Sequence, residues 1–166
     1  MLLFAMDELD IRAVNHLMKS GRATWAELSG VLGLSSPSTA DRVRRLEESG
    51  VIRGYAAIVD PVRVGCTLTA FVSVTVEHPK YRALILERLK DLDAVQECHH
   101  VTGDYDYLLK VRATSPAHLE HIISNDLKEL PGVSKTYTIV ALSTVKETTE
   151  LPLNRDAISQ SVPFRN

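Results

Sequence analysis

The stretch from residue 24 to residue 54 constrains the fold most, because several helix signals follow one another there within a few residues. Thr24 with Glu27 three residues later is a capping-box start, and Gly33 is a typical helix end. Ser36, which precedes a proline, predicts a second start, since serine accepts an orphan amide hydrogen bond and proline fixes the first helical φ. The spacing predicts two short helices joined by a tight turn.

The second of these helices, expected from Ser36 to about Ser49, has two different faces. Val43 and Leu46 can pack inward, while the opposite side carries hydroxyl and arginine side chains. Small hydroxyl residues allow close approach to base edges in the major groove, and arginine pairs with guanine or phosphate. The candidate DNA-binding residues are Ser36, Ser38, Thr39, Arg42, Arg44, Arg45 and Arg53. An ordinary helix pair with a solvated charged face is the alternative, and the pattern alone leaves both open.

The charge distribution favours a local rather than a global attraction to nucleic acid. The chain of 166 residues carries a formal net charge of −2 at pH 7. Four arginines nevertheless lie between Arg42 and Arg53, where Arg44 stands beside two glutamates and is expected at the surface or on a phosphate. Because this patch is small, we expect weak DNA affinity per protomer and a need for dimers.

The cysteines and the hydropathy suggest a cytoplasmic protein. Cys66 and Cys98 provide no disulfide framework and fit a reducing compartment. The opening MLLFA is too short for a secretory signal, and no later run approaches the ~20 apolar residues of a membrane span.

The rest of the first sixty residues completes a small domain. A helix is expected from Met6 to Lys19, with Asp7 as its cap, and Trp25 is expected to anchor the helical core. Residues 51–60 are rich in β-formers and are expected to form a wing strand. Residues 1–60 therefore read as a winged helix-turn-helix domain.

After a linker at residues 61–67 the periodicity changes. The expected elements are a strand at 68–77, a helix at 81–92, strands at 95–102 and 106–113, a helix after Ser115, and a last strand at 133–146. The order βαββαβ is that of a ferredoxin-like domain, with both helices on one face of an antiparallel sheet. We therefore predict an α+β protein whose second domain spans residues 68–148. Residues 149–166 show no clear period and are interpreted as an intersubunit arm or a disordered tail.

Both faces of this predicted sheet carry apolar side chains. On the first strand Val72 and Phe71 point to opposite sides, and on the last strand Val140 and Ile139 do the same. Because two helices can bury only one face, we expect a homodimer through the other face. Two linked DNA-binding domains can then engage two half-sites.

Several motifs together resemble the Lrp/AsnC, or feast/famine, family of transcription regulators. They are MDELDIRAV, GRATWAELSGVLGLSSPSTADRVRRLEESGVIRGYAAIVDP, HHVTGDYDYLLKV and LPGVSKTYTIVAL, which cover residues 6 to about 146. The resemblance implies operator DNA as a partner, dimers assembled into octamers, and an amino acid or related metabolite as effector, with no cofactor.

The resemblance also implies an effector site between dimers, at the turn before the third strand and on the last strand. The corresponding residues are Thr102, Gly103, Asp104, Tyr105, Asp106, Thr136 and Thr138. Either aspartate can pair with an ammonium group, while turn amides and threonine hydroxyls can receive a carboxylate. The alternative is that the sequence GDYD is simply a tight turn.

Metal and enzyme functions are less well supported. Cys98, His99 and His100 cannot all face one ion in a regular strand, and His118 with His121 would form half a site at most. No metal site is therefore expected. An enzyme related to sirohaem decarboxylases and a metabolite-sensing module without DNA binding are the alternatives to a regulator. No set of catalytic residues stands at a recognisable spacing, so we expect no enzymatic activity.

Overall fold

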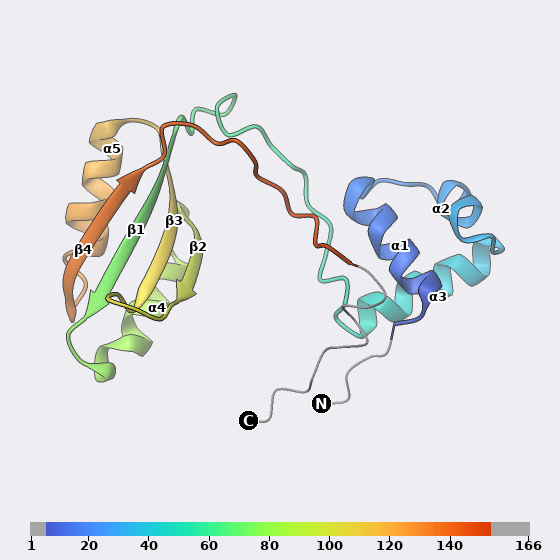
Figure 1. Cartoon of the computed structure of the whole chain (residues 1–166), viewed down its shortest axis with the longest axis horizontal. Helices are drawn as coiled ribbons and strands as arrows, with labels where there is room; N and C mark the ends of the chain where they lie inside the picture. Colours follow the sequence, from blue (N-terminus) through green and yellow to red (C-terminus); the bar gives the residue numbers. More distant parts are fainter. Residues whose placement is uncertain (1–5, 154–166) are drawn as a thin grey trace. The chain divides into compact units, whose positions relative to one another are not determined.

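The computed structural model describes residues 6–153, which form two compact units (Figure 1). The first unit, here called the head, comprises residues 6–58 and 146–153, and the second, the sensor, comprises residues 59–145. The expectations for MLLFA and for residues 154–166 lie outside the described residues. Within the described part, no helix has both the length and the apolar character to cross a bilayer.

The head contains α1 (Glu8–Lys19), α2 (Trp25–Leu32) and α3 (Ser36–Glu48). The capping boxes at Asp7 and Thr24 are confirmed, and Gly33 closes α2 in the left-handed conformation, with φ 69°. The expected cap of α3 is wrong by one residue. Ser35, not Ser36, is the cap, because its extended backbone lets its hydroxyl accept from the Ser38 amide at 3.4 Å.

The three helices of the head enclose one apolar core. Its buried members are Ala13, Val14, Leu28, Leu32, Val43 and Leu46. Trp25, expected to anchor this core, is 51% exposed. The tryptophan stands at the first position of α2, whereas the residues that pack inward come at Leu28 and Leu32, one and two turns later.

The wing strand expected after α3 is not formed. Residues 53–60 have no regular secondary structure, since the described part of the head offers no strand with which they could pair. Tyr55 is instead tied to α3 through its hydroxyl, which donates to Glu47 Oε1 at 2.9 Å. Partial burial and this hydrogen bond raise the Tyr55 pKa to about 12.

The C-terminal segment returns to the head. The Leu153 side chain packs against the head core, and its carbonyl accepts from Asn15 Nδ2 at 3.4 Å. The amide of Leu151 lies 3.3 Å from Met18 Sδ. Residues 151–153, part of the segment expected to be an arm or a disordered tail, therefore contact α1. The chain passes between the two units twice.

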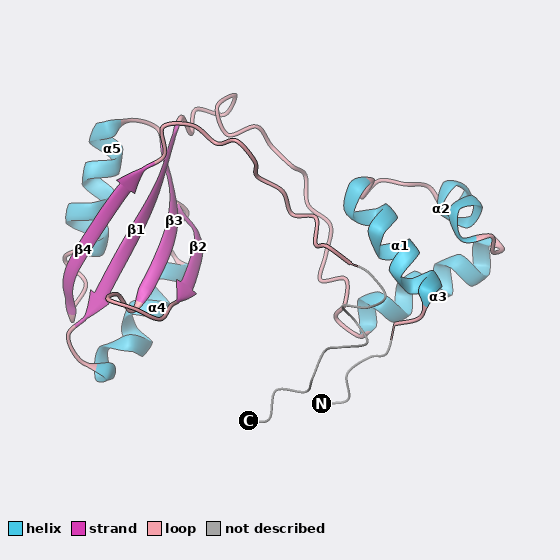
Figure 2. Cartoon of the chain, viewed as in Figure 1, coloured by secondary structure: helices cyan, strands magenta, loops and turns pink. Residues whose placement is uncertain are grey.

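The sensor is a four-stranded antiparallel sheet with helices on one face (Figure 2). Its elements are β1 (Leu68–Val76), η1 (Pro79–Tyr81), α4 (Arg82–Lys90), β2 (Val95–His100), β3 (Tyr107–Ala113), α5 (Pro116–His121), the π-helical η2 (Ile122–Leu127) and β4 (Val133–Val140). The strand order is β2-β3-β1-β4, so the predicted βαββαβ arrangement is confirmed. β4 ends at Val140, opposite Ala70, and not at residue 146 as expected, because its partner β1 begins at Leu68 and extends only two residues further.

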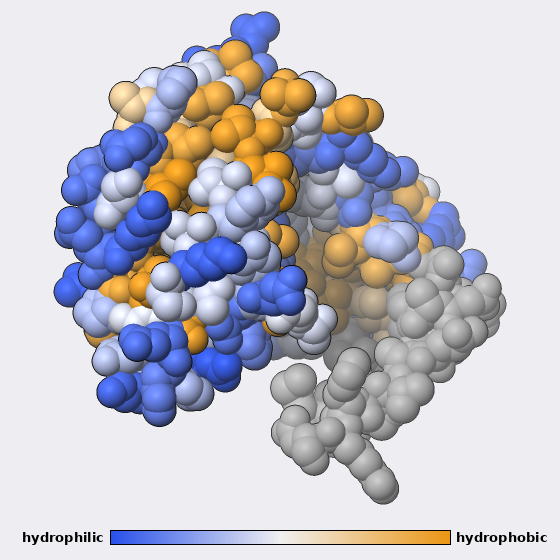
Figure 3. Space-filling model, turned by 60° about the vertical axis from the view of Figure 1, so that its left-hand side comes forward, coloured by the Kyte–Doolittle hydropathy of each residue, from blue (hydrophilic) through white to orange (hydrophobic). Residues whose placement is uncertain are grey.

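The two faces of the sheet differ as expected. Val72 and Val74 are buried against α4, α5 and η2, while Phe71, Tyr137 and Ile139 on the other face are 37%, 51% and 51% exposed. In register, Phe71 lies opposite Ile139 and Ser73 opposite Tyr137, so these side chains share what we call the open face. Figure 3 shows hydrophobic surface gathered on the sensor.

Gly132 sets the entry into β4. Its φ is +88°, and a Cβ at this position would lie 2.2 Å from the Tyr81 ring. Only glycine lets this turn pass so close to the aromatic ring while the backbone is left-handed. Glycine at this position thus has a packing cause as well as a conformational one.

Candidate DNA-binding and effector sites

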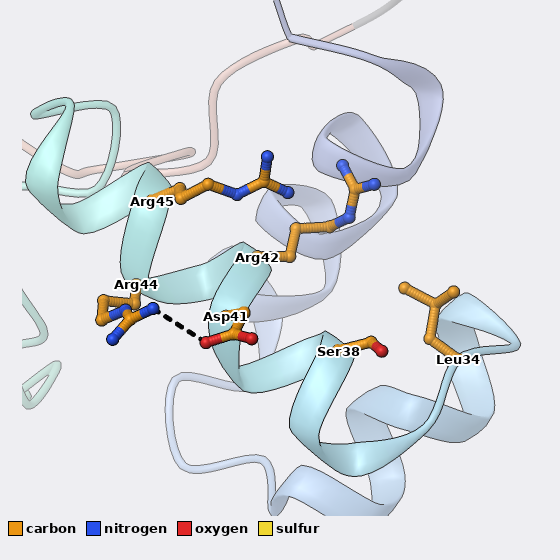
Figure 4. A pocket seen from close by; sticks show the side chains of 6 residues that line it. All are labelled: Leu34, Ser38, Asp41, Arg42, Arg44 and Arg45. Carbon is orange, nitrogen blue, oxygen red and sulfur yellow. Dashed lines mark hydrogen bonds and ion pairs between the residues drawn. The ribbon is translucent and has the colours of Figure 1, made fainter.

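The outward face of α3 lines a shallow hollow in the head (Figure 4). The lining residues are Leu34, Ser38, Asp41, Arg42, Arg44 and Arg45. Ser38 and Arg45 are exposed, and α3 begins just after the turn that closes α2. The helix therefore presents hydroxyl and guanidinium groups along one side, which is what contact with a phosphate backbone and base edges requires.

Arg44 and Arg45 are the accessible cations of this face. The Arg44 side chain is 65% exposed and lies 2.9 Å from Asp41 and 3.9 Å from Glu48. Such exposed pairs within one helix are weak, so a phosphate can displace them. Ser36 and Arg53 are also exposed, but Arg53 lies in the irregular segment after α3 and outside the residues that line the hollow.

Thr39 does not belong to the exposed face. Its side chain is 0% exposed, and its hydroxyl lies 3.1 Å from the hydroxyl of Ser29 on α2. Thr39, Val43 and Leu46 follow one another at helical spacing, so Thr39 occupies a core position. The expectation that it faces DNA is wrong, because its polarity is satisfied by a buried partner that the sequence pattern did not reveal.

Arg42 points from α3 toward the start of α1 (Figure 4). Its Nη1 lies 2.7 Å from Asp7 Oδ2 and 2.5 Å from Asp10 Oδ1. Burial disfavours the ionised Asp7, but hydrogen bonds from Arg42 and the Asp10 amide outweigh this and lower the Asp7 pKa. Arg42 thus lines the hollow with a guanidinium group already held by two carboxylates.

In the sensor, the turn before β3 is closed by Asp106. Its carbonyl accepts from the Val101 amide at 3.0 Å, and its carboxylate accepts from the Val76 amide at 2.8 Å and from Arg82 at 3.2 Å. The pairing of β1 with β3 ends at Val74 opposite Tyr107, so the Val76 amide lies beyond the end of β3 and has no strand partner. The Asp106 carboxylate is therefore engaged in hydrogen bonds that stabilise the fold.

The other turn residues remain accessible. Thr102, Gly103 and Asp104 are exposed, and Gly103 has φ +115°. The Tyr105 ring stacks on Tyr137 with centroids 6.2 Å apart. Lys135 Nζ lies 5.8 Å from the Tyr105 ring. The residues Lys135 and Tyr137 were not predicted for this site, although the two-residue period of β4 places both on the face of Tyr105.

The two threonines of β4 lie on the other face. Thr136 is opposite Val74 and Thr138 is opposite Val72, and both valines are buried under the helices. Thr136 and Thr138 are half-buried there. The predicted effector residues are therefore split by the sheet, with Tyr105 on the open face and the threonines on the helix-covered face.

The histidines and cysteines form ordinary polar contacts. His99 and Lys110 hold Glu97 at 3.1 and 3.0 Å, and these hydrogen bonds lower the Glu97 pKa. Burial raises the pKa of the Cys98 thiol, and the His100 ring packs on Tyr107. Within residues 6–153, no three histidine, cysteine, aspartate or glutamate side chains gather as a metal site would need.

Two known families match this architecture, one for each unit. Residues 6–53 match a winged helix-turn-helix DNA-binding family, and residues 69–151 match the Lrp/AsnC ligand binding domain. The two matches together cover most of the chain. The gap between them contains the first boundary between the units, and the second match continues into residues 146–151 of the head.

Individual relatives match over nearly their whole length. The chain is 37% identical to the HTH-type transcriptional regulator FL11 of Pyrococcus abyssi over 149 residues, which are 90% of this chain and 97% of the relative. It is 37% identical to the leucine-responsive regulatory protein of Escherichia coli over 148 residues, which are 88% of this chain and 90% of the relative.

Solved structures show the same likeness. A Neisseria meningitidis transcriptional regulator in complex with L-methionine aligns with TM-score 0.86 at 32% identity, covering 90% of this chain and 97% of that chain. A feast or famine regulatory protein of Mycobacterium tuberculosis, complexed with L-methionine, aligns with TM-score 0.82 at 35% identity, covering 89% and 99%.

Proposed function

This chain belongs to the Lrp/AsnC family of transcriptional regulators, and on that premise we propose that it binds operator DNA through α3 and changes its DNA binding when an amino acid occupies the sensor. The observation that carries the proposal is the exposed face of α3, where Ser38, Arg44 and Arg45 line one hollow. We assign the protein no enzymatic step, and we place its action in the cytoplasm.

The proposed DNA contacts are the accessible members of the predicted set. They are Ser36, Ser38, Arg44, Arg45 and Arg53. Each arginine that neutralises a phosphate releases counterions, so DNA affinity must fall as salt rises. A single head offers few such contacts, which is why two linked heads are needed for tight binding.

We propose a homodimer in which two open faces pack together. Phe71, Tyr137 and Ile139 form a partly exposed apolar group in register on this face. A second copy of the sheet would remove that apolar surface from water, which stabilises the dimer. Assembly of dimers into octamers is proposed from family resemblance.

We propose an amino acid as the effector because two similar solved structures are complexes with L-methionine. In this chain we assign the ammonium contact to Asp104, which is exposed, and the carboxylate contact to the amides around Gly103. Asp106 holds the turn in shape and is not assigned an ammonium contact. Thr102 and Tyr105 are proposed to line the site, which a neighbouring dimer completes. Thr136 and Thr138 lie on the helix-covered face and are not assigned to it.

Two measurements test the proposed function. Fluorescence anisotropy with a duplex from the region upstream of the protein's own gene should show binding that weakens as salt rises. Thermal unfolding with each of the common amino acids should show stabilisation by at least one of them, because a ligand that binds only the folded state stabilises it by mass action. Salt-independent or absent DNA binding would contradict the first part, and no stabilisation by any amino acid would contradict the second.

A further inference from the structure

Arg42 differs from its neighbours on α3 in how it is surrounded. Its side chain is 14% exposed, against 65% for Arg44. A single nitrogen, Nη1, lies within hydrogen-bond distance of both Asp7 and Asp10. To reach a phosphate, Arg42 would have to leave two carboxylates, whereas Arg44 would give up only solvated pairs with its own helix.

The carboxylates that hold Arg42 are themselves fixed by the start of α1. Asp7 Oδ1 accepts from the Asp10 amide at 2.8 Å, and Asp10 Oδ2 accepts from the Asp7 amide at 3.0 Å. The Asp10 side chain is only 8% exposed. Without the guanidinium group this buried carboxylate would lose its counter-charge, which is costly in a poorly hydrated place. The capping box therefore fixes the two carboxylates in the positions at which they bind Arg42.

Helix α1 has a second arginine tie. Arg12 on α1 donates to the carbonyl of Val31 on α2. The two helices of the helix-turn-helix are thus each linked to α1 by one guanidinium group, α2 through Arg12 and α3 through Arg42. Helix α1 therefore holds both helices in place, including α3, the helix proposed to bind DNA and here called the reading helix.

We propose that Arg42 is a positioning residue that clamps α3 to the start of α1, and that it makes no contact with DNA. The proposal rests on the DNA-binding role proposed above. The proposal excludes the opposite arrangement, in which Arg42 leaves the two aspartates and contacts a phosphate when DNA binds.

These two arrangements predict opposite effects of neutralising Asp10. If Asp10 competes with DNA for Arg42, then Asp10→Asn frees a cation, removes a negative charge and strengthens DNA binding. If Arg42 is a clamp, Asp10→Asn loosens α3 and weakens DNA binding. Asparagine keeps the volume of aspartate and can still accept from the Asp7 amide, so the capping of α1 is preserved.

The experiment measures binding of the full chain to two fluorescent duplexes over a range of KCl concentrations. One duplex is the region upstream of its own gene, and the other has the same composition in scrambled order. We expect Asp10→Asn and Arg42→Met each to weaken binding to the upstream duplex roughly tenfold, and the double variant to be no weaker than either. The slope of log affinity against log salt stays at the wild-type value, because no phosphate contact is lost.

Arg45→Met is the matched control, since Arg45 lies on the same helix three positions away and is exposed. It should reduce the magnitude of the salt slope by ~0.9 for each head that engages the duplex, the value for one phosphate contact. Arg42→Lys keeps the charge but not the forked geometry, and it should behave like Arg42→Met. Fluorescence of Trp25, the only tryptophan of the chain, verifies that every head is folded at the temperature of measurement.

Tighter binding by Asp10→Asn, or a smaller salt slope in Arg42→Met, would overturn the clamp. If the wild-type chain binds neither duplex, the proposed function fails, and the clamp is then judged by unfolding alone. A double-mutant cycle between Arg42 and Asp10 should show strong coupling in the free energy of unfolding, and a coupling near zero would refute the clamp.

Discussion

The reading helix of the head and the effector turn of the sensor divide their charged residues in the same way. In each region one predicted ligand contact is used by the fold, Arg42 in α3 and Asp106 in the turn, while a neighbour stays accessible, Arg45 and Asp104. The head separates the two roles by three positions on a helix, and the sensor separates them by two positions in a turn. Whether a charged residue near a binding surface contacts the ligand or stabilises the fold is therefore decided by its hydrogen-bond partners and not by its position in a motif.

The regions differ in how the division arises. In α3 the two arginines stand three positions apart and line the same hollow, so the helical period does not separate them. Arg42 is held at the start of α1 because Asp7 and Asp10 lie within reach of its guanidinium group. In the turn the cause is the end of a strand pairing, since β3 begins at Tyr107 opposite Val74 and Asp106 accepts from the Val76 amide beyond that point. The first division depends on two carboxylates at the start of another helix, whereas the second depends on where the pairing between two strands ends.

The largest expected effect comes from breaking the proposed dimer, which is formed by the sensor and increases the DNA affinity of the head. Phe71→Asp places a charge on the open face and should convert the dimer to a monomer, as measured by light scattering. DNA affinity should fall by a factor of about 10² or more, because the second head is no longer tethered. Leu84→Asp is the matched control, since Leu84 on α4 is 40% exposed, close to the 37% of Phe71, but is not on the open face. An unchanged mass in Phe71→Asp would show that the open face is not the interface.

The next effect sharpens the contrast within the turn. Asp106→Ala should lower the free energy of unfolding of the sensor by about 2 kcal/mol, because the Val76 amide and Arg82 lose their acceptor. Asp104→Ala should change stability by less than about 0.5 kcal/mol but reduce the response to the stabilising amino acid. Urea unfolding followed by far-ultraviolet circular dichroism measures the first, and calorimetry measures the second. Equal destabilisation by both variants would remove the distinction between them.

A smaller effect tests the same division on α3. Thr39→Val should destabilise the head by about 1 kcal/mol, because the buried Ser29 hydroxyl loses its nearer partner and keeps only the Ser36 hydroxyl at 3.4 Å. Ser38→Ala, at the neighbouring exposed position, should alter stability by less than about 0.5 kcal/mol. Trp25 fluorescence during urea unfolding reports both. A larger loss in Ser38→Ala than in Thr39→Val would reverse the assignment of the two hydroxyls.

The smallest expected effect is a pH dependence shared by both regions. The pKa values of Asp7 in the head and Glu97 in the sensor are lowered in the folded state. Their stabilisation is therefore complete above the unfolded carboxyl pKa, about 4, and is lost as the pH falls through the lower folded value. Glu97→Gln should flatten this dependence for the sensor, and Asp7→Asn should flatten it for the head. A dependence that persists in both variants would assign it to other carboxyls.

The sequence predicted the elements whose signals are local. Capping residues, glycine stops and period-two alternation located the three head helices and the four strands, with errors of a few residues at their ends. The missing wing and the short β4 have a common cause, because a strand ends where its partner ends and a single sequence does not contain that information. Ser35 and Ser36 are adjacent serines, so only the backbone geometry could decide which one is the cap.

The candidate sites were predictable only in outline. A hydrophilic position such as Thr39 looks the same in sequence whether it faces water or a buried hydroxyl, and Ser29 lies ten residues away on another helix. The split of the effector residues by the sheet was implicit in the alternation of Thr136, Tyr137 and Thr138. It became visible only once the register with β1 fixed which face the helices cover.

The return of the C-terminal segment to α1 has a consequence for synthesis. The helices of the head are the first part of the described chain to leave the ribosome, yet Leu153, which packs on their core, is among the last. The head can therefore reach its final packing only after the sensor has been translated. A nascent or prematurely terminated chain would lack this contact with α1, so the packing of the head is completed only in a chain that also carries the sensor.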